Sequence, residues 1–160
     1  MLAVDGAAQR RIEYLIHEWA RAIDENRVED AAELLAADGE YKVASRFNDD
    51  RGLPLAVIHC NNRAQLRDRI KSMRVANVYE PHHYRHLVTG IQVINAAGPI
   101  YEVRSNYLVI RTMEHDGTMS VFSAGQYRDS IELAGEAACF RRRHVVYDSR
   151  VIDTLLVIPI

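Results

Sequence analysis

Apolar and polar residues alternate along two long stretches in the second half of the chain, and this period of two is typical of β-strands. The first stretch covers residues 101–113 and the second 118–133, with a hairpin turn at 115–117 that contains an Asp-Gly pair. Both are much longer than the usual strand of about 5–6 residues, so we expect them to bend around other elements. Gly125, in the middle of the second strand, indicates a bulge or a bend.

The same alternation predicts one apolar face for each long strand. The residues expected on these faces are Tyr101, Val103, Tyr107, Val109 and Met113 in the first strand, and Met119, Val121, Tyr127, Ile131 and Leu133 in the second.

Helical spacing of apolar residues, at intervals of three and four, marks three segments in the first half of the chain. The predicted helices cover 6–25, capped by Asp5, then 28–37, ended by Gly39, and 63–75, capped by Asn61 or Asn62. Four further strands are predicted at 40–46, 55–60, 83–95 and 136–150, with a polar loop at 48–52. We expect the apolar segment 151–160 at the edge of the sheet or in a subunit contact.

The predicted order is α-α-β-β-α-β-β-β-β, with the helices early and the long strands late, which favours an α+β fold over βαβ units. A long curved antiparallel sheet wrapped over the N-terminal helices makes a cone with a cavity between the two layers. At 160 residues the whole chain, 1–160, is expected to form one domain.

Composition and charge exclude several classes of protein. The net charge of -2 gives no reason to expect nucleic acid as a partner. Cys60 and Cys139 are far apart in the sequence, so they suggest two buried thiols in a reducing compartment rather than a zinc ribbon or a disulfide framework. We see no signal peptide and no apolar run near the ~20 residues that span a membrane, so a cytoplasmic protein is expected.

Three histidines, His82, His83 and His86, lie within five positions of one predicted strand. His82 and His86 then share a face and His83 opposes them. A metal site needs ligands that converge from one side, and no nearby Cys or Asp completes one. These histidines are therefore expected to meet water, a carboxylate or another subunit.

The expected cavity could hold a small ligand among Asp24, Tyr41, His83, His86 and Tyr107. Small enzymes of this architecture transfer protons with a carboxylate or a His-Tyr set, and Asp24 could be the base. Alternatively, Asp24 is a solvated acid at the end of a helix. The chain has no G-x-S-x-G, P-loop or dinucleotide-binding fingerprint.

Charged residues in the last strands suggest pairing between neighbouring strands. They are Arg128, Asp129, Arg141, Arg142, Arg143 and Asp148. On a regular strand Arg141 and Arg143 share a face and Arg142 opposes them.

Four motifs, at 86–93, 103–111, 123–129 and 140–148, occur in order along the second half of the chain. They read HLVTGIQV, VRSNYLVIR, SAGQYRD and FRRRHVVYD. This set resembles the small (beta) subunit of Rieske-type aromatic ring-hydroxylating dioxygenases, and the first helices and the strand at Tyr41 fit the same family. Cys139 stands where members often have Trp, and 48–60 departs from the usual pattern.

The resemblance implies a cone-like fold shared with nuclear transport factor 2 and ketosteroid isomerase. It also implies a non-catalytic structural subunit with no catalytic, cofactor-binding or metal-binding residues of its own. The Rieske iron-sulfur cluster and the mononuclear iron are expected in the large (alpha) partner, in an α3β3 hexamer with homotrimeric beta contacts. The aromatic substrate would be an acid such as anthranilate, salicylate or a halobenzoate.

The residues predicted at the subunit interface, from their place in the motifs, are His82, His86, Arg104, Arg128, Asp129, Arg142, Arg143 and Asp148. Two other hypotheses stay open. One is a free-standing isomerase, dehydratase or cyclase that uses Asp24, Tyr41, His83 or His86, and a deep pocket that holds two of these groups within hydrogen-bond reach would favour it. The other is a ligand-binding or scaffold module, which an enclosed apolar cavity would favour.

Overall fold

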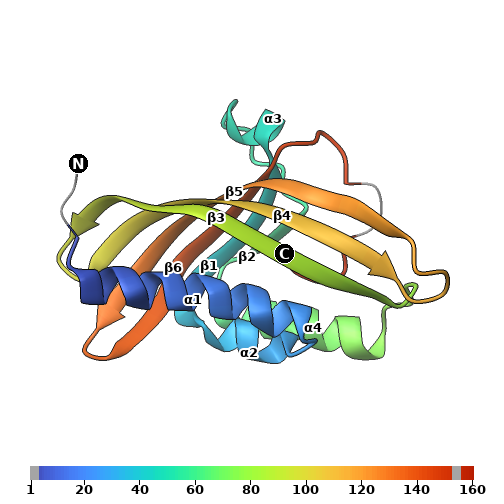
Figure 1. The fold of residues 1–160 in the computed structure, drawn as a ribbon, viewed down its shortest axis with the longest axis horizontal. Helices are drawn as coiled ribbons and strands as arrows, with labels where there is room; N and C mark the ends of the chain where they lie inside the picture. Colours follow the sequence, from blue (N-terminus) through green and yellow to red (C-terminus); the bar gives the residue numbers. More distant parts are fainter. Residues whose placement is uncertain (1–3, 153–155) are drawn as a thin grey trace.

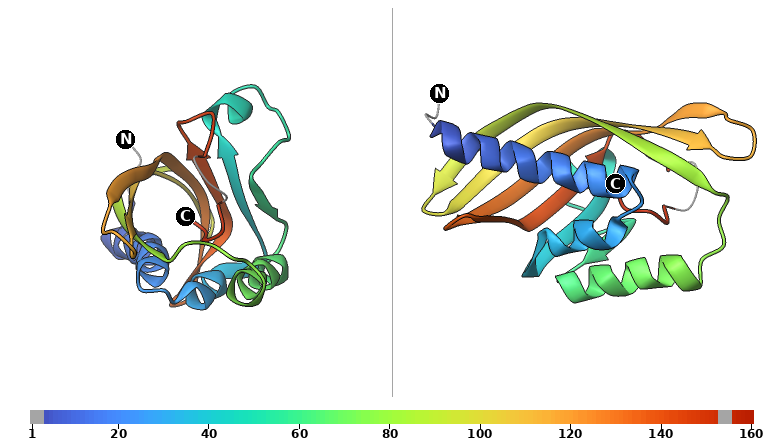
Figure 2. Two further views of the ribbon diagram at one scale, coloured as in Figure 1. Left: turned by 90° about the vertical axis from the view of Figure 1, so that its right-hand side faces the viewer. Right: turned by 60° about the horizontal axis from the view of Figure 1, so that its bottom comes forward.

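A six-stranded sheet curls over one layer of helices in the computed structural model, which describes residues 4–152 and 156–160 (Figures 1 and 2). The elements are α1 (Gly6–Asp24), α2 (Val28–Glu33), β1 (Leu35–Ser45), α3 (Arg46–Asp49), β2 (Ile58–Cys60), α4 (Arg63–Val75), β3 (His82–Ala97), β4 (Ile100–Met113), β5 (Met119–Ala134) and β6 (Ala137–Tyr147). The predicted α+β cone is therefore confirmed. Among the described residues, no helix is both long and apolar enough to cross a membrane.

The strand order is β2-β1-β6-β5-β4-β3. Neighbouring strands are antiparallel with one exception, the parallel pair β1 and β6 in the middle of the sheet. The predicted long antiparallel sheet is thus found in four strand pairs, and only the β1–β6 pair departs from it. The parallel pair arises because β1, from the first half of the chain, adds beside the last strand.

The helices α1 and α4 begin where the sequence predicts. The Asp5 carboxylate accepts from the Ala8 N–H, and the Asn62 side chain accepts from the Gln65 N–H at 2.9 Å. The apolar stripe of α1, which includes Ile12, is buried beneath the sheet because its spacing places those residues on one face.

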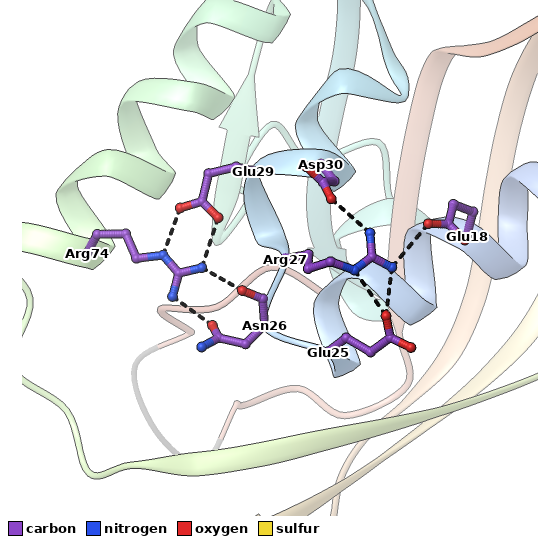
Figure 3. Close-up of polar contacts among 7 residues, drawn as sticks. All are labelled: Glu18, Glu25, Asn26, Arg27, Glu29, Asp30 and Arg74. Atoms are coloured by element: carbon purple, nitrogen blue, oxygen red, sulfur yellow. Dashed lines mark hydrogen bonds and ion pairs between the residues drawn. The ribbon is translucent and has the colours of Figure 1, made fainter.

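Arginines connect the three helices of the lower layer (Figure 3). Arg27 contacts Glu18, Glu25 and Asp30 at 2.8–3.2 Å. Arg74 of α4 binds Glu29 of α2 at 2.7 Å and donates to the Asn26 carbonyl at 2.8 Å. These contacts hold the layer together at the connection between α1 and α2.

The second helix is shorter than predicted, and β1 is longer. Helix α2 ends at Glu33, and Leu35 already pairs with Phe140 of β6. Gly39 does not end a helix but lies at an irregularity in β1, where a Cβ would come within 2.8 Å of the Phe140 carbonyl oxygen. Pairing with a distant strand overrides the local helical pattern here.

The segment after β1 also differs from the prediction. The expected polar loop begins with α3, which Ser45 caps by accepting from the Asn48 N–H at 3.2 Å. Of the predicted strand 55–60, Ile58–Cys60 forms β2 beside β1, and Leu55 is exposed.

Bulges change which face some side chains occupy. In β5, Phe122 is the extra residue, because Val109 pairs with Ser123 while the next residue of β4 pairs with Val121. Phe122 therefore turns inward and stacks on Tyr84, and Val121 faces solvent, contrary to the prediction. Met119, beyond the same bulge, is also exposed, contrary to the prediction.

A second bulge, in β6, leaves Arg141 without a partner in β5, because Ile131 pairs with Phe140 and Ser130 pairs with Arg142. Arg141 consequently does not share the buried face of Arg143, contrary to the prediction, and pairs with Asp38 at 2.7 Å.

The described end of the terminal segment, 156–160, packs into the core, while Val151 at its start is exposed. In its described part, Leu156, Val157 and Ile160 are buried in the core, and the end of the chain lies within the curl of the sheet (Figure 2). Residues 153–155 of the predicted segment lie outside the described residues.

Gly125 marks a close approach between strands and not a bulge, because the pairing of β4 and β5 continues through it. A Cβ at this position would lie 2.1 Å from the Val146 carbonyl oxygen of β6. The tight curvature of the sheet therefore requires glycine here.

Gly125→Ala should lower the free energy of unfolding by about 1–3 kcal/mol, because two strands must move apart to admit the methyl group. Gly6→Ala is the matched control, since a Cβ there meets only the Arg10 side chain at an ordinary 3.5 Å. Urea unfolding of both variants checks this, and equal midpoints would contradict it.

Candidate functional site

The inner face of the cone is filled by aromatic rings around one arginine. The Arg143 guanidinium carbon lies 3.8 Å from the Tyr127 ring centroid, 4.7 Å from Phe140 and 4.9 Å from Trp19. Trp19 comes from α1 and the others from β5 and β6, so this arginine joins the helix layer to the sheet. Its side chain has 0% exposed surface.

Asp129 balances this buried charge. Its Oδ2 accepts from Arg143 Nη1 at 2.9 Å, and the two residues are direct partners across β5 and β6. The predicted charge pairing between neighbouring strands is therefore confirmed for this pair. Burial raises the pKa of Asp129 to about 6 against the opposing effect of Arg143, and Oδ1 has no hydrogen-bond partner among the described residues.

Tyr41 of β1 belongs to the same cluster, because it pairs with Arg143 across β1 and β6 and its ring centroid lies 5.3 Å from that of Trp19. Its hydroxyl donates to the Ile160 carbonyl oxygen at 2.9 Å and accepts from the Ile160 N–H at 3.1 Å. Burial raises the pKa of Tyr41, so the phenol stays protonated and suits a structural role. Tyr107 is likewise buried and hydrogen-bonds to the Ser123 hydroxyl at 2.9 Å.

Asp24 and His86 are brought together, as the hypothesis of a small enzyme requires. His86 Nδ1 lies 2.6 Å from Asp24 Oδ1, and the His86 backbone N–H donates to Asp24 Oδ2 at 2.9 Å. Because β3 is the edge strand, this second bond satisfies an N–H that no further strand would bind. The pair fastens the end of α1 to the open edge of the sheet.

The position of this pair does not suit catalysis. The His86 side chain has 0% exposed surface and that of Asp24 has 7%. A groove of about 570 Å³ borders both residues, but it reaches only the backbone of His86, because the imidazole is buried. A substrate in that groove would not meet the ring.

Tyr41 and His83 lie away from this pair. His83 is on the opposite face of β3, exposed, 3.1 Å from Glu114. A pocket of about 240 Å³ is lined in part by Asp24, His82 and His83, but Tyr41 and His86 are absent from its wall. Of the four predicted catalytic groups, only Asp24 and His86 meet.

The predicted interface residues do not all lie on one face of the sheet. His86, Asp129 and Arg143 are buried on the inner face. Four others lie on the outer face or near its rim: Arg104 contacts the Gln92 side chain, Arg142 Glu102 and Asp148 Arg46, and Arg128 forms a short ion pair with Asp49. His82 is half-buried on the face of β3 that carries Tyr84, with ring centroids 5.0 Å apart, and its Nδ1 lies 2.7 Å from the Glu80 carbonyl oxygen.

The donor set does not fit a Rieske cluster or a mononuclear iron. The described residues contain no group of three or more His, Cys, Asp or Glu side chains that could hold a metal. Burial raises the pKa of both thiols, Cys60 and Cys139, which disfavours the thiolate form that binds metal.

Comparison with known proteins decides the family. A model of the ring hydroxylating beta subunit family matches residues 18–154. The chain belongs to this family. The small subunit of anthranilate 1,2-dioxygenase from Burkholderia cepacia is 35% identical over 138 residues, 86% of this chain and 85% of that protein.

Two further relatives agree with this assignment. A beta subunit of the terephthalate 1,2-dioxygenase terminal oxygenase component from Comamonas sp is 30% identical over 142 residues, 89% of this beta subunit and 92% of that protein. The crystal structure of an aromatic-ring-hydroxylating dioxygenase beta subunit from Novosphingobium aromaticivorans DSM 12444 superposes with a TM-score of 0.88 at 32% identity, covering 96% and 97% of the two chains.

Sequence reasoning missed the contribution of α3 to the outer face of this beta subunit. Asp49 pairs with Arg128 and lies 3.5 Å from His144. Ser45 followed three residues later by Asn48 was an available capping signal for a short helix, but nothing in the local sequence indicates that Asp49 reaches two distant strands.

Arg143→Ala should lower the free energy of unfolding of the beta subunit by about 3–5 kcal/mol, because Asp129 is left buried without its partner. The double variant Arg143→Met/Asp129→Asn should recover most of this loss, since it removes both charges and keeps the volume. Urea unfolding measures both values. If the free energy of unfolding of Arg143→Ala lay within about 1 kcal/mol of the wild-type value, Arg143 would not be needed to compensate the charge of Asp129.

The stability of wild type relative to Asp129→Asn should depend on pH. The pKa of Asp129 in the folded protein, about 6, lies above its value in the unfolded chain. The contribution of Asp129 to the free energy of unfolding is therefore fully present below about pH 4 and is lost as the pH rises through about 6. Urea unfolding of both proteins from pH 4.5 to 8 checks this. The free energy of unfolding of wild type minus that of the variant should fall as the pH rises. A difference that stays constant or rises would contradict this prediction.

Proposed function

We propose that this chain is a non-catalytic structural subunit of a multicomponent aromatic ring-hydroxylating dioxygenase. The family match over residues 18–154 carries this proposal. A small subunit of such an enzyme implies a large alpha partner, and the Rieske cluster and mononuclear iron belong to that partner. The buried rings of Trp19, Tyr41, Tyr127 and Phe140 pack the cone interior around Arg143, and this favours a structural role.

We further propose that the complex acts on an aromatic acid. Two relatives that are at least 30% identical are named for anthranilate and terephthalate, and both compounds are aromatic carboxylates. The beta subunit contributes to this reaction by holding the large subunit, and the partner selects the substrate.

The proposed assembly is a cytoplasmic α3β3 hexamer with trimeric beta contacts. The outer-face residues Arg104, Arg128, Arg142 and Asp148, together with His82, are proposed to contact other subunits directly. His86, Asp129 and Arg143 are fully covered within one chain, so they would act by holding the strands that present those residues.

Co-purification tests the function. The tagged chain is expressed with the neighbouring genes of its source genome, and the mass and iron content of the product are recorded. We expect a stoichiometric complex with a larger, iron-containing partner. A chain that purifies alone and free of iron from this co-expression would overturn the proposal.

Asp148→Ala should weaken assembly while leaving the isolated chain folded. Asp148 is half exposed and pairs with Arg46 at 2.6 Å, and loss of a surface ion pair costs only about 0–1 kcal/mol of stability. Asp68→Ala, an exposed acid on α4, is the matched control. Native mass spectrometry of co-expressed complexes gives the readout, and equal complex yield from both variants would count against this contact.

A further inference from the structure

A row of basic side chains crosses the outer face of the whole sheet. Strand pairing places these residues directly opposite one another, so their side chains share one face. From β3 to β2 the row begins with the neutral Gln92 and continues with the basic residues Arg104, Arg128, His144, Lys42 and His59. The row contains one residue from each strand of the sheet, so it cannot be recognised in any continuous stretch of the sequence.

The two neighbouring rows have a different composition. On one side Glu102, Ser130, Arg142 and Glu40 stand in register, and Arg142 binds Glu102 at 2.9 Å, so opposite charges meet within that row. On the other side the row is uncharged: Asn106, Gln126, Val146 and Ala44. Among these three rows, the excess of positive charge therefore lies in the middle one.

Carboxylates of the chain itself neutralise only part of the positive charge of this row. Asp49 of α3 binds Arg128 and approaches His144, and Glu40 binds His59 at 2.7 Å. Among the described side chains, Arg104 hydrogen-bonds to the neutral Gln92, at 3.1 Å. Within the described part of the chain, no carboxylate forms an ion pair with Lys42 or with Arg104.

Like charges opposite each other on a sheet are unfavourable, so this arrangement lowers the stability of the isolated chain. The effect is visible at His144, where burial lowers the pKa and the nearby cations Lys42 and Arg128 lower it further, against the effect of Asp49. Carboxylates supplied from outside would relieve this repulsion.

We propose that the basic row, from Arg104 to Lys42, is the docking surface for an acidic segment of the large dioxygenase subunit. This rests on the proposed function, which supplies the partner. The backbones of Arg104 and Lys42 are three strand spacings apart, about 14 Å, and Arg128 and His144 lie between them, so each of the two cations suits a carboxylate of its own. The partner segment therefore carries at least two carboxylates, one for each end of the row. Arginine binds a carboxylate with two parallel hydrogen bonds, which suits Arg104 to fix the register of that segment.

Carbodiimide cross-linking of the wild-type complex tests this directly, because the reagent joins a lysine amine to a carboxylate in contact with it. The chain has two lysines, Lys42 in the row and Lys71 on the exposed face of α4, so Lys71 is an internal control. We expect a cross-linked peptide between Lys42 and an Asp or Glu of the large subunit. Cross-links from Lys71 alone, from Lys42 to another copy of this chain, or none would overturn the proposal.

Charge reversal provides a second test. Arg104→Glu and Lys42→Glu should each weaken binding to the large subunit about tenfold or more, because like charges then face each other across the contact. Lys71→Glu should bind as wild type. The dissociation constant is measured at several salt concentrations, after thermal unfolding shows that each variant is folded.

These experiments distinguish failure of the proposed function from failure of the proposed docking surface. A wild-type chain that binds no large subunit would overturn the proposed function and with it the docking surface. Normal binding of wild type together with normal binding of Arg104→Glu and Lys42→Glu would overturn only the docking surface.

Discussion

The buried pair of Arg143 and Asp129 is the constraint on which the rest of this structure depends. A guanidinium without exposed surface is costly unless a carboxylate and polarisable groups surround it, and here Asp129 and three aromatic rings do so. Trp19 must then lie under β5 and β6, which sets the position of α1 against the sheet. A one-residue shift between the two strands would turn one charge outward and leave the other buried alone.

The same arrangement explains why a fold suited to a ligand cavity serves here as a subunit. The rings around Arg143 and the terminal residue Ile160 fill much of the interior, so the inner face supports the sheet. The Asp24–His86 contact closes the edge by satisfying a backbone donor of β3. The charges of the outer face lie in rows that only the pairing of the strands creates.

Local patterns predicted the elements whose signals are strong and short in range. Helix α4 begins and ends at the predicted residues, because Asn62 caps it and its apolar spacing is regular. The long strands β4 and β5 were also recognised, since alternation over many residues is hard to produce by chance. The errors occurred where distant strands intervene: β1 begins at Leu35 because Phe140 pairs with it, and the bulge at Phe122 reverses the faces of the residues before it.

The sequence by itself determined the α+β class, most of the elements and the family, because periodicity, caps and short motifs are properties of neighbouring residues. It also indicated that Asp129 and the following arginines would pair across strands. Only the tertiary structure decided that Arg143 is buried, that Asp24 meets the ring of His86, and that cations from separate strands align on the outer face. Those relations depend on register, bulges and curvature, which are set by packing between segments far apart in the chain.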